Sequence, residues 1–201
     1  MASVLKLKAG SRITSATKLF EGYRISDEQI IANVSIDKIE SVMRHFIAMH
    51  HEPLFFILEL PANLKQEKEV KPGVIETFHK DVYYIDGCTQ EEAIAIMLRA
   101  GDILFNDGMS SFGYGGHRSG DEIMFGKYNV LTIYTKHPES YTDFFETHDI
   151  QRDDALVLAW DTFTKKTPGD SRLYEANGMS VYDIPEQFKD WGIYCAERRE
   201  D

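Results

Sequence analysis

Four residues near the middle of this 201-residue chain carry side chains suited to acid and base catalysis: His117, Arg118, Asp121 and Glu122. A histidine changes its charge near neutral pH and can accept a proton, an arginine can bind an anionic group, and a carboxylate can orient the histidine. Because the four residues lie close together in the chain, the sequence predicts a catalytic site for a small polar substrate.

Three further residues of the same stretch are predicted to bind a partner: Asp107, Phe112 and Tyr114. Glycines and serines stand beside the two aromatic residues, and a glycine-rich segment between strands is typical of an exposed loop. We therefore expect residues 106–122 to lie outside the hydrophobic interior, with Phe112 and Tyr114 as aromatic anchors for a partner.

The sequence lacks the motifs of several other site classes. The glycine-rich run 113–116 leads into a strand pattern, whereas a phosphate-binding loop leads into a helix. His45, His50 and His51 do not lie four positions apart, and the acidic stretch 146–154 lacks the spacing of a calcium loop. No G-x-S-x-G motif of a serine hydrolase is present. We therefore expect no metal and no cofactor.

The chain is acidic, because 33 Asp and Glu against 22 Lys and Arg give a formal net charge of −11. This charge repels nucleic acid and favours a basic protein partner. Two cysteines without a C-x-x-C motif indicate a reducing compartment, and the sequence offers no signal peptide and no apolar run long enough to cross a bilayer. We expect a cytoplasmic protein that binds neither nucleic acid nor membranes; the oligomeric state stays open.

Hydrophobic spacing predicts two main helices and a short one. Apolar residues recur every three or four positions from 36 to 50, after a cap residue at Ser35. Thr89 and Glu92 form a capping box for a second helix, which we expect to end at Gly101. Pro138 predicts the start of a third, short helix over residues 138–148.

Short apolar runs bounded by turn residues predict the strands. Residues 29–34 fit either a strand or a helical turn, and Asn177 with Gly178 is a strong hairpin signal. The other expected strands are 54–60, 81–86, 103–105, 123–125, 130–135, 155–163, 173–176, 179–182 and 192–196.

The strands outnumber the helices, and tight turns join several of them. The sequence therefore predicts an α+β fold with a mixed or largely antiparallel sheet and two or three packed helices. The charged segment 61–72 is interpreted as an exposed loop, so that residues 1–201 are expected to form a single domain.

The acidic charge, the lack of an enzyme motif and the expected aromatic loop favour a binding role. Our leading hypothesis is a cytoplasmic binding protein, such as an immunity-type or accessory protein that neutralises a basic protein partner. Two alternatives are an enzyme that acts on a small polar substrate through residues 106–122 and a module that senses a small ligand.

Overall fold

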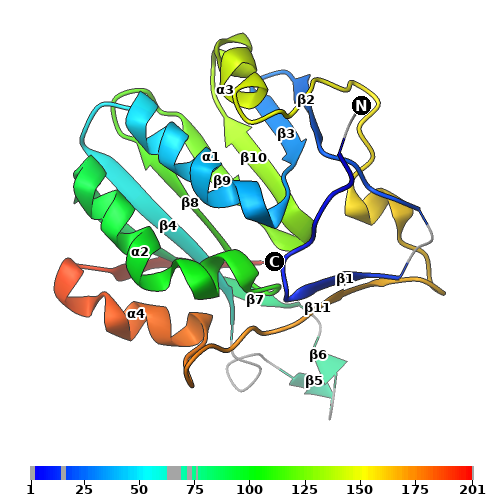
Figure 1. Ribbon diagram of the computed structural model, residues 1–201. Helices are drawn as coiled ribbons and strands as arrows, with labels where there is room; N and C mark the ends of the chain where they lie inside the picture. The colour runs from blue at the N-terminus through cyan, green and yellow to red at the C-terminus, as the bar shows by residue number, and fades with distance from the viewer. Residues whose placement is uncertain (1–2, 15–16, 63–68, 72–73, 76, 201) are drawn as a thin grey trace.

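The computed structural model describes residues 3–14, 17–62, 69–71, 74–75 and 77–200. It has an α+β fold around an eight-stranded antiparallel sheet of strand order β12-β7-β4-β8-β9-β10-β3-β2 (Figure 1). The strands of this sheet are β2 (Gly22–Ser26), β3 (Gln29–Asn33), β4 (Leu54–Pro61), β7 (His79–Cys88), β8 (Ser111–Gly116), β9 (Glu122–Phe125), β10 (Val130–Tyr134) and β12 (Tyr194–Glu200). The predicted fold class is confirmed.

Two short strand pairs lie outside the main sheet. β1 (Ser11–Ile13) pairs with β11 (Gly169–Ser171), and β5 (Glu69–Lys71) pairs with β6 (Val74–Ile75), both in antiparallel fashion. Of the charged segment 61–72 predicted to be a loop, residues 63–68 and 72 lie outside the described residues, whereas Pro61 ends β4 and residues 69–71 form β5.

The first predicted helix is α1 (Ile36–Met49), and its apolar stripe is buried as the spacing requires. Ser35 stands at the N-cap position, but its side chain does not cap the helix. Its hydroxyl oxygen accepts a hydrogen bond from the Lys6 backbone N–H at 3.0 Å instead, and so ties the N-terminal segment to the start of α1.

The second helix, α2 (Gln90–Asn106), begins with the predicted capping box at Thr89 but does not end at Gly101. The apolar stripe continues through Ile103 and Leu104, which are buried against the sheet. Residues 103–105 are therefore helix, and the prediction of a strand there was wrong. Gly101 lies beside the Phe105 ring, one turn further along the same helix, so that this glycine serves packing and does not stop the helix.

The predicted short helix occurs as a 3-10 turn, η3 (Pro138–Tyr141), followed by α3 (Thr142–Glu146). The strand expected over 155–163 was wrong, because this segment is irregular and ends in a 3-10 turn, η4 (Ala159–Thr162). Asn177 and Gly178 both have positive φ and form the predicted turn, although only one isolated bridge flanks it. A final helix, α4 (Ile184–Gln187), precedes β12.

All four α-helices pack on one face of the sheet. α1, α2, α3 and α4 contribute side chains to a single hydrophobic cluster with the inward residues of the strands, and α1 and α2 lie in front of the sheet in Figure 1. Among the described residues, no α-helix covers the opposite face, which we call the open face. The described helices include none with the length and hydrophobicity needed to cross a membrane.

Candidate functional site

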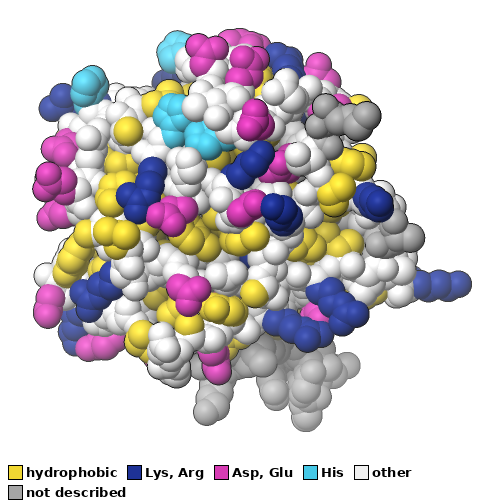
Figure 2. All heavy atoms as spheres, in the orientation of Figure 1, with side chains coloured by type: hydrophobic (Ala, Val, Ile, Leu, Met, Phe, Trp, Pro, Cys, Tyr) yellow, Lys and Arg dark blue, Asp and Glu magenta, His cyan; other side chains and the backbone are white. Residues whose placement is uncertain are grey.

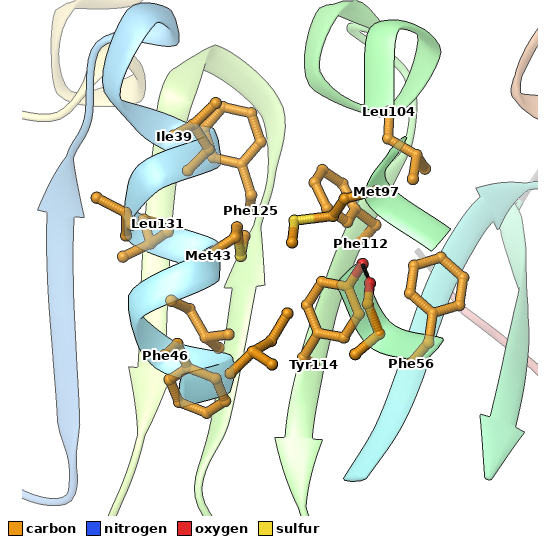
Figure 3. Packing of buried hydrophobic residues seen from close by; sticks show 14 of the residues in the cluster. Ile39, Met43, Phe46, Phe56, Met97, Leu104, Phe112, Tyr114, Phe125 and Leu131 are labelled. Carbon is orange, nitrogen blue, oxygen red and sulfur yellow. Dashed lines mark hydrogen bonds between the residues drawn. The ribbon is translucent and has the colours of Figure 1, made fainter. Parts of the chain in front are cut away.

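The two aromatic residues predicted to be exposed lie in the core. Phe112 is 1% exposed and Tyr114 is 0% exposed, and both side chains pack with residues of α1 and α2 (Figure 3). The Tyr114 hydroxyl donates to the Ala93 carbonyl at 3.2 Å. Large and small residues alternate along β8, so that the aromatic side chains face the helices while Gly113 and Gly115 face the open side. The prediction of an exposed aromatic loop was therefore wrong.

Asp107 is also buried and serves the structure of the chain. It stands at the C-cap of α2, and its carboxylate accepts hydrogen bonds from the backbone N–H groups of Met109, Ser110 and Tyr174 at 2.7–3.0 Å and from the Ser110 hydroxyl at 2.8 Å. A carboxylate with four internal donors and no exposed surface has no capacity left for a partner. The prediction that Asp107 binds a partner is corrected accordingly.

Asp121 points to the helix side, where it meets Tyr141 and His50. The Tyr141 hydroxyl donates to the Asp121 carboxylate at 2.6 Å, and the His50 Nε2 atom lies 3.2 Å from that hydroxyl and 3.4 Å from the carboxylate. Burial, followed by the hydrogen bond to Asp121, raises the pKa of Tyr141, which keeps the phenol protonated. The cluster fastens the β8–β9 turn to α1 and η3.

His117 and Arg118 lie in the exposed turn between β8 and β9. The His117 ring packs against Phe55, with ring centroids 5.1 Å apart, and its Nε2 atom lies 3.3 Å from the Asp86 carboxylate. Phe55 and Asp86 are cross-strand partners that face the open side. The structure therefore places His117 at the border of the open face and Asp121 on the other side of the sheet.

Glu122, the last of the four predicted catalytic residues, lines a pocket of about 560 Å³ on the open face. Its walls are formed by residues of β4, β7, β8, β9, β10 and β12, of η4, and of a 3-10 turn, η2 (Lys127–Asn129). The charged residues that line it are two carboxylates and three cations: Glu59, Glu122, Lys80, Lys127 and Arg199. Tyr134 and Trp160 contribute aromatic rings. The volume is in the range of natural ligand pockets.

Glu59 is buried in this pocket and is neutralised by two cations. The Lys80 ammonium lies 2.9 Å from its carboxylate, and the Arg199 guanidinium from β12 forms a second ion pair with it. A buried carboxylate is stable only with such partners, so that Lys80 and Arg199 are needed to keep Glu59 charged inside the pocket. Their charges are largely committed to Glu59.

Glu122 differs from Glu59, because its carboxylate has neither a hydrogen bond nor an ion pair with any side chain of the described residues. Burial raises the pKa of Glu122 above its usual range, and the nearby Glu59 carboxylate raises it further, while Arg199 lowers it. The negative charge of Glu122 is thus the one in the pocket that is left without a close counter-ion in the described chain.

The rest of the pocket wall is aromatic and thioether-rich. Tyr134 is the cross-strand neighbour of Glu122, and Trp160 comes from η4. Their side chains are 46% and 47% exposed, which is unusual for large rings. Met109 and Met124 complete this wall. Aromatic and methionine side chains of this kind are enriched at protein interfaces.

The glycines of β8 lie next to the strand that carries Glu122 and Met124, and Gly113 is the least replaceable of them. A Cβ atom at Gly113 would lie 1.8 Å from the Ile123 carbonyl oxygen and 2.7 Å from the Met124 sulfur. We expect Gly113→Ala to lower the free energy of unfolding by about 2 kcal/mol, measured by urea denaturation. Gly126→Ala is the matched control, since its Cβ would meet its nearest atom at 3.4 Å; an equal effect of both substitutions would contradict the steric explanation.

The sequence analysis missed most of the pocket: Glu59, Lys80, Tyr134, Trp160 and Arg199. One signal was available, because Glu59 is a charged residue inside a run that was predicted to be a buried strand. Such a residue requires a cation nearby. The cations come from strands far away in the chain, and the single sequence does not say which ones.

The described residues contain no group of three or more histidine, cysteine or acidic side chains placed to hold a metal ion. Comparison with protein-family models, with curated proteins and with solved structures finds no match to this chain.

Proposed function

We propose that this protein is a binding protein that docks a basic protein partner on the open face of its sheet. The observation that carries the proposal is the pocket, in which half-exposed rings surround the carboxylate of Glu122 that lacks a close counter-ion. An immunity-type role, in which the partner is a toxin, is one form of this function.

The aromatic side chains of the open face support docking of a protein. Tyr194 of β12 is 47% exposed and stacks on Tyr84, with ring centroids 6.3 Å apart. With Tyr134 and Trp160 it gives the open face three large rings that are about half exposed. Residues of this type carry most of the binding energy in many interfaces, since they bury a large area at little cost in side-chain entropy.

The charge of the molecule supports a basic partner. The net charge of −11 attracts cationic proteins and raises the rate of association more than the affinity. On the helix side, which Figure 2 shows, acidic side chains gather at the top near α3, where Glu139, Asp143 and Glu146 lie. The pocket is lined by two carboxylates and three cations, so that the acidic surplus lies outside it and contributes to long-range attraction.

The enzyme alternative has weaker support. A general base must lie within hydrogen-bonding reach of the groups that assist it. Of the four residues proposed for catalysis, Asp121 is engaged on the helix side, Arg118 stands in the turn, and only His117 and Glu122 belong to the open side. The small-ligand alternative shares the pocket with the proposed function and is tested with it.

The proposal predicts that the double variant Tyr134→Ala/Trp160→Ala loses partner binding. We expect affinity capture from the native cell lysate at low salt to recover a basic protein with the wild-type chain and at least about tenfold less of it with the double variant. Added salt should weaken the capture. The control is Tyr182→Ala, which removes a ring of 42% exposure outside the pocket.

Three results would count against this function. Capture of no protein by the wild-type chain, equal capture by the double variant, or capture of an acidic protein each contradicts the proposal. A thermal shift with a metabolite, abolished by Tyr134→Ala/Trp160→Ala in the absence of any captured protein, would assign the pocket to a small ligand instead.

A further inference from the structure

Glu122 lines the pocket from a strand that is paired on both sides. In β8 its cross-strand partner is Gly115, and in β10 its partner is Tyr134. Directly opposed side chains stand about 5 Å apart, so that the Tyr134 ring and the Glu122 carboxylate are immediate neighbours. On the other side Gly115 has no side chain, and the Phe55 ring covers it, so that the space available to a ligand lies on the Tyr134 side of Glu122.

The charges of the pocket specify the group that fits there. Glu59 already holds Lys80 and Arg199, whereas Glu122 has no ion pair among the described residues. A cation placed at Glu122 would pair with the carboxylate, and the face of an adjacent aromatic ring attracts a cation as well. Lys127 also lines the pocket, but the charges that shift the pKa of Glu122 are those of Glu59 and Arg199, and Arg199 is paired with Glu59. An anion beside Glu122 would therefore be repelled by its carboxylate and by that of Glu59.

We infer that the pocket is a specificity site for one basic side chain of the partner, with Glu122 as the counter-ion and Tyr134 as the aromatic wall. This inference rests on the proposed function and adds the class of group that the partner presents. A guanidinium group fits best, because its plane can lie on the tyrosine ring while its N–H groups donate to the carboxylate.

The electrostatics of the pocket predict that binding of a basic side chain depends on pH. Burial and the neighbouring Glu59 raise the pKa of Glu122, so that this carboxyl takes up a proton at a higher pH than an exposed glutamate does. A protonated Glu122 cannot pair with a cation. Binding of the basic side chain should therefore weaken as the pH falls toward the ordinary range of glutamate, and this loss should begin at a higher pH than the titration of an exposed glutamate.

The test uses two small probes that differ in charge and hardly in shape. Nα-acetyl-arginine methylamide carries the guanidinium group, and Nα-acetyl-citrulline methylamide is its neutral counterpart. Both are titrated into the ¹⁵N-labelled full chain, and the indole N–H signal of Trp160, identified with the Trp191→Phe variant, reports occupancy of the pocket. We expect the arginine probe to shift this signal and to bind about tenfold more tightly than the citrulline probe.

The variants decide whether Glu122 is the counter-ion. Glu122→Gln keeps the size of the side chain. It should lower the affinity for the arginine probe about tenfold and leave the affinity for the citrulline probe unchanged. Glu175→Gln, at an exposed glutamate outside the pocket, should change neither. Equal binding of the two probes, full binding to Glu122→Gln, or no shift of the Trp160 signal would overturn the inference.

The outcome for this site can be separated from the outcome for the function. If partner capture depends on Tyr134 and Trp160 but is unchanged in Glu122→Gln, the result supports the docking surface and contradicts the cation site. If the arginine probe binds in a Glu122-dependent way but no protein is captured, the result supports the cation site and contradicts the proposed protein partner.

Discussion

The free energy of unfolding of the wild-type protein is expected to rise by about 3 kcal/mol between pH 7 and pH 10 relative to that of the Lys8→Met variant. Lys8 is 1% exposed, and burial lowers the pKa of its ammonium group from 10.5 to about 7. Its Nζ atom donates to the Gly126 carbonyl at 2.8 Å and lies 4.8 Å from the centroid of the Phe125 ring.

The direction of this effect follows from proton binding. Above pH 7 the folded protein releases the Lys8 proton, whereas the unfolded chain keeps it up to about pH 10.5. The unfolded state therefore binds more protons in this window, and stability increases with pH. Below about pH 7 both states are protonated and the contribution of Lys8 no longer changes. Methionine has no proton to exchange.

Urea denaturation of both proteins at several pH values measures this difference. The control is Lys18→Met, at an exposed position, for which the difference from the wild type should stay nearly constant over the same window. If the free energies of unfolding of Lys8→Met and of the wild type change in parallel from pH 7 to pH 10, Lys8 stays charged in the folded protein and the prediction is wrong.

The second large effect is expected for Asp107→Ala, which should lower the free energy of unfolding by about 4 kcal/mol. The substitution leaves three backbone N–H groups and the Ser110 hydroxyl without their acceptor in a buried place. It also removes the carboxylate whose charge opposes the lowered pKa of Lys8. Thermal and urea denaturation give the magnitude.

Glu175→Ala is the matched control for this prediction. Glu175 is an exposed carboxylate next to Tyr174, and its removal should change stability by less than about 0.5 kcal/mol. A loss below about 1 kcal/mol for Asp107→Ala would contradict the role of Asp107 as the hydrogen-bond centre of this region.

Local patterns predicted much of the fold. The spacing of apolar residues located α1, and the capping box at Thr89 located the start of α2. The end of α2 was missed, because Gly101 was interpreted as a stop signal while its packing against Phe105 depends on tertiary structure. The segment 155–163 has the apolar content of a buried strand but forms no ladder, and sequence composition alone does not reveal which strand pairs form.

The candidate site was predicted in part. Glu122 lines the pocket and His117 lies at the border of the open face, whereas Phe112 and Tyr114 are buried on the helix side. The error arose from the glycines of β8. They were read as signs of a flexible loop, although their alternation with aromatic residues is equally the pattern of a strand with one bulky face.

The organisation of the core bears on the number of domains. One hydrophobic cluster extends from Tyr23 to Phe188 and joins all four α-helices to the main sheet. The N-terminal segment adds contacts to the middle of the chain, where the Lys8 backbone N–H donates to Asn129. We propose on this basis that residues 1–201 form one domain.

The pairing of β1 with β11 has a consequence for how the protein emerges from the ribosome. The Thr14 hydroxyl donates to the Pro168 carbonyl, across 154 positions, and β1 finds its partner strand only after that segment has been made. At ordinary rates of translation the first strand waits about 8 to 30 s for the second. The pairing of β1 with β11 therefore forms only late in the synthesis of the chain.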